Sequence, residues 1–367
     1  MKISFVRGAY LNNFEGQNFD LHVTGYSSLF PLDSNVPFPI VKLPSIADLQ
    51  KIPLFDKPIK YIANRTLGDS QILFGLEKNI IYSDIVHVAD LHYYYSYQAA
   101  QLKKKRLIKK LVSTWWETIP FNNESTDAKK RIKKYCMSQV DRFFCYTEKA
   151  KKCLIEEGVD AQRISVLPLG VNTSLFKPCL STKQSKFNIL FVGRLVEEKG
   201  ILDLYTSFKQ LIEDGNNAFL RIIGTGPLKG ILQNHIQKDG FQDKITIEKK
   251  SYKEMPEVYQ QASVLCVPSK KTKTWEEQYG MVFVEALASG LPIVSYDTGV
   301  IKSIVGNGGI IVAENDISGI TNSLERIMKA ELRGKIGTIG RERAELFFNS
   351  QKTKQTISKL YKGLFLE

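Results

Sequence analysis

Short apolar runs alternate with amphipathic segments along the first half of the chain. The runs contain β-branched and aromatic residues, and they predict strands at residues 2–6, 81–88, 111–114 and 140–146. Apolar positions with a helical period predict helices at residues 97–110 and 127–138. Strands that alternate with helices are typical of a parallel sheet covered on both faces.

The second half of the chain repeats this alternation. Residues 164–178 have no helical period, and residues 180–187 are polar. Strands are then predicted at residues 188–193, 219–224, 244–249, 263–269, 292–297 and 309–314. Helices are predicted at residues 199–213, 253–262 and 280–289. The pattern therefore predicts an α/β protein with two doubly wound domains, in which ligands bind beyond the carboxyl ends of the strands.

A length of 367 residues fits two domains of ordinary size. We expect them at residues 1–178 and 188–348, with a linker at 179–187. Residues 349–367 are predicted to form a helix that packs back toward the first domain. No apolar run is long enough for a membrane-spanning helix, and the N-terminal residues predict a strand and not a signal peptide. Five cysteines without metal-type spacing predict reduced thiols and a cytoplasmic location.

The net charge of +13 is concentrated in one segment, residues 101–152, which holds 15 Lys and Arg against 5 Asp and Glu. Within it, QLKKKRLIKK and DAKKRIKKYC predict helices with cations on one face and apolar residues on the other. Such a face suits an anionic membrane surface, which would make the protein peripheral on a membrane. A solvated face of a lysine-rich protein is the alternative, and no motif supports binding to nucleic acid.

Two acids stand out in the stretch VPSKKTKTWEEQYGMVFVEALASG. The backbone N–H groups of Gly280, Met281 and Val282 are predicted at a helix N-terminus, where they favour an anion. Glu277 is predicted just before this helix and Glu285 in its second turn, both outside the deep core. Two carboxylates around a bound phosphate suit a ligand with several hydroxyl groups. For Glu277, a simple complement to the helix dipole remains an alternative.

A second candidate site lies in the stretch FVGRLVEEKG. The predicted strand ends at Gly193, which allows close approach of another backbone, and Arg194 and Lys199 follow it. An Arg and a Lys at the end of a parallel strand suit a diphosphate. The alternative is a pair of surface cations that neutralise the neighbouring Glu197 and Glu198.

Four motifs in order carry a resemblance to a known family. GRLVEEKG, IIGTGPL, VPS and E-x7-E followed by ALASGLPIV, between about residues 188 and 298, resemble the C-terminal domain of retaining glycosyltransferases of family 4. That family has the GT-B fold of two Rossmann-like domains. ISVLPLGVNTSLFKP resembles the segment that closes the family's N-terminal domain.

The resemblance implies a retaining hexosyltransferase that moves a sugar from a UDP- or GDP-linked donor to a hydroxyl acceptor. It gives Arg194 and Lys199 to the donor diphosphate, Glu285 to the ribose and Glu277 to the transferred sugar. The backbone of residues 280–282 would contact the sugar and the distal phosphate. No cofactor and no metal are expected, because fixed cations and helix N–H groups can neutralise the leaving diphosphate.

The N-terminal half departs from the family pattern. The family has a Gly-Gly loop after its first strand, and FEGQN offers Gly16 as the remaining glycine of this loop. The resemblance assigns Gly16 to donor binding. Trp116 and Glu117 follow the strand after which the family often has a sugar-contacting His. Rival functions are a GT-B sugar-nucleotide epimerase, which the E-x7-E spacing disfavours, and a phosphorylase, for which no cofactor-lysine segment is found. A non-catalytic polyanion-binding protein on the same scaffold is a third rival.

Overall fold

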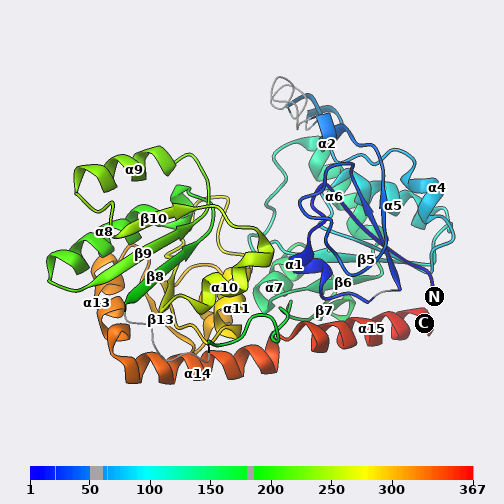
Figure 1. Ribbon diagram of the computed structural model, residues 1–367. Coiled ribbons are helices and arrows are strands. Elements are labelled where there is room, and N and C mark those ends of the chain that lie inside the picture. The colour runs from blue at the N-terminus through cyan, green and yellow to red at the C-terminus, as the bar shows by residue number, and fades with distance from the viewer. Residues whose placement is uncertain (21, 50–60, 64, 180–185, 367) are drawn as a thin grey trace. The chain divides into compact units, whose positions relative to one another are not determined.

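The computed structural model describes residues 1–20, 22–49, 61–63, 65–179 and 186–366. The chain divides into two compact units (Figure 1). Unit 1 contains residues 1–169 and 350–367, and unit 2 contains residues 170–349. Each unit is built on its own sheet, and in both sheets every strand pairing is parallel. Two parallel-sheet units of this kind make the predicted α/β architecture.

The sheet of unit 1 has seven strands in the order β3-β2-β1-β4-β5-β6-β7. The strands are β1 (Ile3–Gly8), β2 (Val23–Ser27), β3 (Ile40–Lys42), β4 (Ile85–Val88), β5 (Lys110–Trp115), β6 (Arg142–Cys145) and β7 (Ile164–Val166). The order reverses between β1 and β4. In an open parallel sheet, this switch point opens a crevice beyond the carboxyl ends of the strands.

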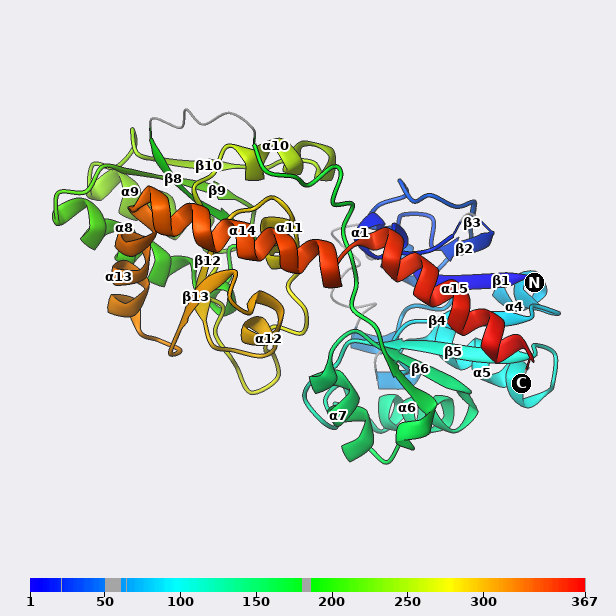
Figure 2. The ribbon, with the colours of Figure 1, turned by 90° about the horizontal axis from the view of Figure 1, so that it is seen from below.

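Alternating side chains of these strands build two hydrophobic clusters, one on each face of the sheet. Phe5 and Phe144 belong to one cluster, while their neighbours Val6 and Phe143 belong to the other. Helices of unit 1 whose bounds lie within the described residues are α1 (Asn13–Gly16), α2 (Ile46–Leu49), α4 (Leu76–Ile80), α5 (Tyr94–Lys104), α6 (Asp127–Gln139), α7 (Glu148–Glu156) and α15 (Ser350–Leu366). Helix α15 contributes Ile357, Tyr361 and Leu364 to the Phe5 cluster, so it covers that face (Figure 2). The C-terminal helix thus packs on unit 1.

The sheet of unit 2 has six strands in the order β10-β9-β8-β11-β12-β13. They are β8 (Phe187–Val192), β9 (Ala218–Ile223), β10 (Ile245–Glu248), β11 (Val264–Cys266), β12 (Ile293–Tyr296) and β13 (Gly309–Val312). Its helices are α8 (Ile201–Glu213), α9 (Lys229–Lys238), α10 (Met255–Gln260), α11 (Met281–Ala288), α12 (Ile301–Val305), α13 (Ile317–Met328) and α14 (Ala330–Phe347). Helix α8 packs against α13, and α11 packs against α12 and α14. The switch point of this sheet lies between β8 and β11.

Residues 170–178, which the sequence placed in the first domain, contact unit 2 instead. The backbone N–H of Val171 donates to the Phe348 carbonyl at 2.8 Å. The Arg341 guanidinium donates to the Phe176 carbonyl at 2.8 Å and to the Thr173 carbonyl at 3.0 Å. Of the predicted linker, residues 180–185 lie outside the described residues.

Helix α5 is shorter than the prediction of residues 97–110. It ends at Lys104, and Arg106 adopts a left-handed conformation with φ of 60°. The N–H of Leu107 donates to the Leu102 carbonyl at 3.0 Å, which closes the helix end. Strand β5 then begins at Lys110. The extension to residue 110 was therefore wrong, because the helical period of the sequence runs on through a turn into the next strand.

Candidate functional site

The candidate site of unit 2 lies at the carboxyl ends of β8 and β11, the two strands at the switch point. A single helical turn, Glu197–Lys199, follows β8 and carries Lys199. The loop after β11 carries Ser269, Trp275 and Glu277 before α11 begins. Adjacent parallel strands end at one edge of the sheet, so these loops come together there.

Lys199 and Glu277 form a close ion pair. Their Nζ and Oε2 atoms lie 2.6 Å apart, and the two side chains are only 14% and 8% exposed. The Ser269 hydroxyl donates to the same carboxylate oxygen at 3.1 Å. The Trp275 ring lies 4.7 Å from the Lys199 ammonium, which is cation–π distance. The cluster therefore places a cation, a carboxylate and an aromatic face within one small region.

The backbone around Glu277 is held by close packing. Gly299 has φ of +58°, and a Cβ at this position would overlap the Glu277 carbonyl oxygen. The N–H of Val300 donates to that carbonyl at 3.1 Å. The Thr298 hydroxyl donates to the Ser269 carbonyl at 2.8 Å. The segment that follows β12 therefore fixes the backbone of Glu277. The sequence did not predict this contact.

The N-cap residue of helix α11 is a glycine, which offers no side-chain capping hydrogen bond to the backbone N–H groups of the first turn. The first residue of the helix is Met281, preceded by Gly280 in a left-handed conformation with φ of 75°. A Cβ on Gly280 would lie 2.7 Å from the Phe283 ring atom Cε2, so the glycine serves both conformation and packing. The predicted anion-binding residues Gly280, Met281 and Val282 therefore lie at a helix N-terminus.

Glu285 lies in the second turn of α11 and is 4% exposed. Its Oε2 accepts a hydrogen bond from the Tyr259 hydroxyl at 2.7 Å. Burial raises the pKa of Glu285 to about 7, while hydrogen bonds from Tyr259 and Tyr252 lower it. Glu277 is 6% exposed. The prediction that both acids lie outside the deep core was wrong, because partners that are remote in sequence compensate their burial.

Arg194 and Gly193 follow β8 directly. The Arg194 side chain is 62% exposed and pairs with Glu198 at 3.1 Å. A Cβ on Gly224 would overlap the Gly193 carbonyl oxygen, so the close backbone approach occurs at this point, with Gly224 as the residue that permits it. Arg194 pairs with Glu198 and Lys199 pairs with Glu277, so the two diphosphate candidates reach the same edge with different partners.

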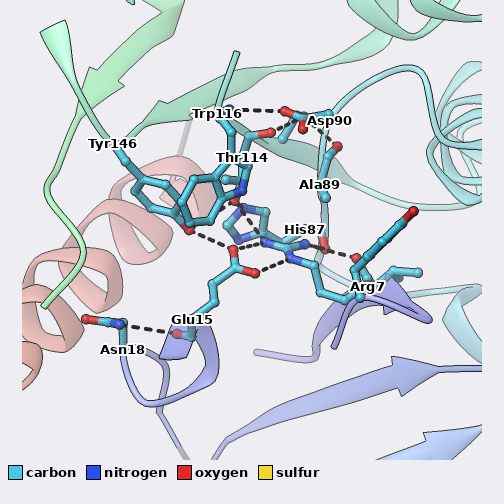
Figure 3. A network of polar contacts seen from close by, with 12 residues as sticks. Arg7, Glu15, Asn18, His87, Ala89, Asp90, Thr114, Trp116 and Tyr146 are labelled. Carbon is cyan, nitrogen blue, oxygen red and sulfur yellow. Dashed lines mark hydrogen bonds and ion pairs between the residues drawn. The ribbon is translucent and has the colours of Figure 1, made fainter. Parts of the chain in front are cut away.

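In unit 1, Gly16 ends the short helix α1 beyond β1. A Cβ on Gly16 would lie 2.7 Å from a methyl carbon of Val36, so packing requires a glycine there. The preceding residue, Glu15, is 3% exposed and forms two hydrogen bonds with the Arg7 guanidinium, at 2.7 and 2.8 Å (Figure 3). The Tyr146 hydroxyl donates to Glu15 at 2.7 Å. The turn that carries Gly16 is thus fixed from β1 and from the end of β6.

The same network reaches β4 and α15. Arg7 donates to the Thr114 hydroxyl at 2.8 Å, and that hydroxyl is also 2.8 Å from His87 Nε2. His87 Nδ1 lies 2.5 Å from the Tyr361 hydroxyl. Burial holds the pKa of His87 well below its usual range. His87 is therefore a neutral core residue that connects the sheet to the C-terminal helix.

Glu117 and Trp116 have structural contacts of their own. The Glu117 carboxylate accepts from the N–H groups of Thr118 and Ile119 and from the side-chain amides of Asn122 and Asn123, at 2.9 to 3.0 Å. The Trp116 ring packs against Tyr146 with centroids 4.4 Å apart. The loop after β5 is thus held by Glu117 itself.

The basic segment 101–152 is divided between two edges of the sheet of unit 1. Helix α5 runs from the carboxyl edge, where β4 ends, to the amino edge, where β5 begins, so Lys104, Lys105 and Arg106 lie at the amino edge. Helix α6 starts at the carboxyl edge and brings Lys130, Arg131 and Lys134 with it. Other cations are paired: Lys103 with Asp141, Lys109 with Asp84, and the buried Lys133 with Glu124 and Glu157.

Several residues of the site were given no role from the sequence: Ser269, Trp275, Gly299 and Tyr259. Ser269 belongs to the VPS motif and Trp275 to the stretch that carries Glu277, but neither was assigned a contact. A buried carboxylate such as Glu285 requires a hydrogen-bond donor, yet the sequence does not show that Tyr259 is that donor. Among the described residues, no helix is long and apolar enough to cross a membrane.

Two family models match consecutive parts of the chain. The model described as Glycosyltransferase Family 4 matches residues 28–175, and the model described as Glycosyl transferases group 1 matches residues 176–343. An uncharacterized glycosyltransferase of Methanocaldococcus jannaschii, MJ1178, is 27% identical over 79% of this chain and 79% of its own length. The capsular polysaccharide biosynthesis glycosyltransferase CapM of Staphylococcus aureus is 30% identical over 49% of this chain and 47% of its own length. The match thus spans about half of CapM.

Solved structures share the fold over almost the whole chain. HepE of Anabaena, solved in complex with UDP, has a TM-score of 0.75 at 14% identity and covers 99% of this chain and 100% of its own. Sucrose-phosphate synthase of Thermosynechococcus elongatus has a TM-score of 0.70 at 18% identity, with coverage of 100% and 99%. At this level of identity, the likeness concerns the fold.

Proposed function

Because the chain belongs to the family-4 glycosyltransferases with the GT-B fold, we propose that it is a retaining hexosyltransferase that uses a UDP- or GDP-linked sugar. The observation that carries this proposal is the ion pair between Lys199 and Glu277 at the switch point of unit 2. In a nucleotide sugar, the distal phosphate is bonded directly to the sugar. A cation for that phosphate and a carboxylate for the sugar hydroxyls must therefore be neighbours, as these two residues are.

The other donor contacts follow from the same arrangement. Arg194 and Lys199 bind the diphosphate, and the N–H groups at the start of α11 bind the distal phosphate and the sugar. Glu285 accepts hydrogen bonds from the ribose hydroxyls. Gly16, in unit 1, stays a donor-binding prediction that rests on the family resemblance. Complexes of HepE with UDP and with UDP-glucose support a uridine nucleotide as the first donor to test.

The reaction we propose is a substitution on one face of the sugar. The bond between the anomeric carbon and the phosphate oxygen breaks, and the acceptor oxygen bonds to that carbon from the same side. The acceptor proton passes to the leaving phosphate oxygen. Lys199, Arg194 and the α11 N–H groups stabilise the charge that develops on the diphosphate, and Glu277 orients the sugar. This charge stabilisation needs no metal ion.

We further propose that the acceptor is a glycan or a lipid-linked sugar and that unit 1 meets an anionic membrane through its carboxyl edge. One relative, from Escherichia coli, is named as a galactosyltransferase acting on a diphosphoundecaprenol-linked sugar. At this edge a hollow of about 530 Å³ is lined by Arg65, Arg131, Ser125 and Thr126, with Glu124 and Asp127 beside them. The exposed side chains of Tyr61, Ile62 and Phe121 supply apolar surface on the segments that flank it. Cations beside exposed apolar side chains suit a lipid headgroup region.

A donor panel tests the enzymatic proposal. The purified chain is incubated with UDP- and GDP-linked hexoses, and mass spectrometry detects release of the nucleoside diphosphate. We expect one nucleotide series to be hydrolysed slowly, and its product to bind in titration calorimetry. Absence of binding and of turnover across both series would overturn the proposal and leave the polyanion-binding alternative.

A further inference from the structure

The carboxylate of Glu285 is held by two tyrosine side chains. Its Oε2 accepts from the Tyr259 hydroxyl at 2.7 Å, and Tyr252 provides a second hydrogen bond. Glu285 is 4% exposed and Tyr259 is 1% exposed, so water cannot replace these donors freely. A carboxylate buried to this degree adopts the orientation that its donors impose.

Local structure fixes the two tyrosines. Tyr252 opens a single helical turn, and α10 follows with Tyr259 near its end. A capping box between Ser251 and Glu254 starts this turn. The Phe176 ring lies 5.8 Å from both tyrosine rings. The tyrosine hydroxyls are therefore attached to rings that cannot easily shift.

The Tyr259 hydroxyl also reaches the start of α11. It lies 3.4 Å from the Val282 carbonyl oxygen, in the first turn of the helix whose N–H groups are assigned to the phosphate and sugar. One hydroxyl thus bridges the carboxylate in the second turn and the backbone of the first turn.

We propose that Tyr259 is a positioning residue of the nucleotide site, which orients the Glu285 carboxylate toward the ribose hydroxyls, with Tyr252 as an auxiliary donor. This inference rests on the proposed function, since it requires Glu285 to bind ribose. One carboxylate oxygen is engaged by tyrosine, and the remaining acceptor capacity serves the ligand. A preoriented carboxylate binds the ligand more tightly, because its side chain loses no further conformational entropy on binding.

The hydrogen bonds have a second effect that a purely structural tyrosine would not produce. Donors to the ionised carboxyl oppose the effect of burial on its pKa. Tyr259→Phe should therefore raise the pKa of Glu285 and move the pH at which nucleotide affinity is half-maximal upward. Burial and the hydrogen bonds from the two tyrosine hydroxyls are the causes of the shift in the pKa of Glu285.

The test is a double-mutant cycle in which titration calorimetry measures the affinity for UDP and for GDP. The affinity for the nucleotide that binds more tightly is then measured from pH 6 to pH 8. We expect Tyr259→Phe to weaken binding about threefold to tenfold. In the Glu285→Gln background, the same substitution should change affinity less than about twofold, because the carboxylate that it positions is gone. Tyr205→Phe is the matched control: its hydroxyl donates to Asp239 at 2.6 Å elsewhere in unit 2, so nucleotide affinity should not change.

The outcomes separate this inference from the proposed function. If Glu285→Gln weakens binding and Tyr259→Phe does not, the inference is overturned while the ribose assignment stands. If Tyr259→Phe costs the same affinity in both backgrounds, the tyrosine is only structural. If Glu285→Gln binds normally, the ribose assignment fails and the inference fails with it. Should Tyr259→Phe not fold, Tyr252→Phe is measured in the same cycle, with a smaller loss and the same upward shift in pH expected.

Discussion

Lys199 and Glu277 are 78 positions apart in the sequence, and their side chains form a buried ion pair of 2.6 Å. Each side chain neutralises the charge of the other. In the proposed complex, a donor phosphate would contact the lysine and sugar hydroxyls would contact the glutamate. The ligand-free pair is thus held by the same charges that the donor would engage, so removing either residue changes the state of the other.

The diphosphate assignment is tested most cleanly at Arg194. Its side chain is exposed and forms a surface ion pair with Glu198, so Arg194→Ala should not lower the melting temperature. We expect it to weaken binding of the nucleoside diphosphate about threefold or more, since a charge-assisted contact is lost. Lys199→Ala should weaken binding about tenfold or more, through the loss of roughly 1.5–3 kcal/mol. Lys209→Ala, a cation of unit 2 paired with Asp239, serves as the control.

Removing Lys199 also leaves the Glu277 carboxylate without its cation, so the melting temperature of Lys199→Ala should fall. Affinity and melting therefore need to be measured together. Unchanged nucleotide affinity in both Arg194→Ala and Lys199→Ala would remove the diphosphate assignment, whatever happens to stability.

Glu277 is expected to act on the sugar and not on the nucleotide. Glu277→Gln should not weaken binding of the nucleoside diphosphate, since it frees Lys199 from its carboxylate partner. It should lower the transfer rate about tenfold or more, because the reacting sugar is no longer oriented. Calorimetry gives the affinity, and a single-turnover assay gives the rate. A loss of nucleotide affinity without loss of rate would reverse the roles given to Glu277 and Glu285.

The fold was largely predictable where apolar runs are long and regular. All six strands of unit 2 coincide with predicted apolar runs, such as β8 with residues 188–193. In unit 1, β2, β3 and β7 were missed because VTGYS, IVK and ISV are short and lack a clear alternation. The end of α5 was also misjudged, since helical periodicity cannot reveal that Arg106 takes a left-handed conformation.

The candidate site was predictable as a set of residues but not as an arrangement. Motif order singles out Lys199 and Glu277, yet nothing in the sequence shows that they pair across two strands. Glu285 was predicted outside the deep core although apolar residues flank it in α11, and its donor Tyr259 lies 26 positions away. Partners of a buried charge are set by tertiary packing, which a local pattern does not encode.

Chelation tests the proposal that transfer needs no metal. Transfer should continue in EDTA at a rate within about twofold of the untreated enzyme, because fixed cations and helix N–H groups stabilise the leaving diphosphate. The initial rate is measured before and after dialysis against the chelator. Loss of activity that Mg²⁺ or Mn²⁺ restores would show that the leaving-group chemistry is wrong.

The two edges of unit 1 give a matched test of membrane binding. Reversing Lys130, Arg131 and Lys134 to Glu should abolish sedimentation with vesicles that contain anionic lipid, since each cation near the surface contributes about 1 kcal/mol. Replacing Lys104, Lys105 and Arg106 with Glu changes the net charge by the same amount, but at the amino edge. Vesicle binding of this variant should therefore persist. Raised salt should weaken the wild-type interaction. Equal binding of wild-type protein to neutral and anionic vesicles would leave only a solvated basic face.

Glu285 should make stability depend on pH in an unusual direction for an acid. Burial raises its pKa from 4.5 to about 7, so between these values the folded protein holds a proton that the unfolded chain has lost. Stability from this group is therefore greatest below pH 4.5, falls as pH rises to about 7, and is level above that. Because Glu285→Gln cannot ionise, its melting temperature relative to wild type should rise across this window.

The same proton should govern nucleotide binding. The ionised carboxylate is the stronger acceptor for ribose hydroxyls, so affinity of the wild type should increase from pH 6 to pH 8 about threefold to tenfold more than that of Glu285→Gln. Comparing the two proteins cancels the titration of the nucleotide phosphate, which both experience. Calorimetry at four or five pH values gives both curves, and differential scanning at the same values gives the melting temperatures. Parallel affinity curves would mean that Glu285 does not contact the nucleotide. A changing melting difference beside parallel affinity curves would confine Glu285 to a structural role in α11.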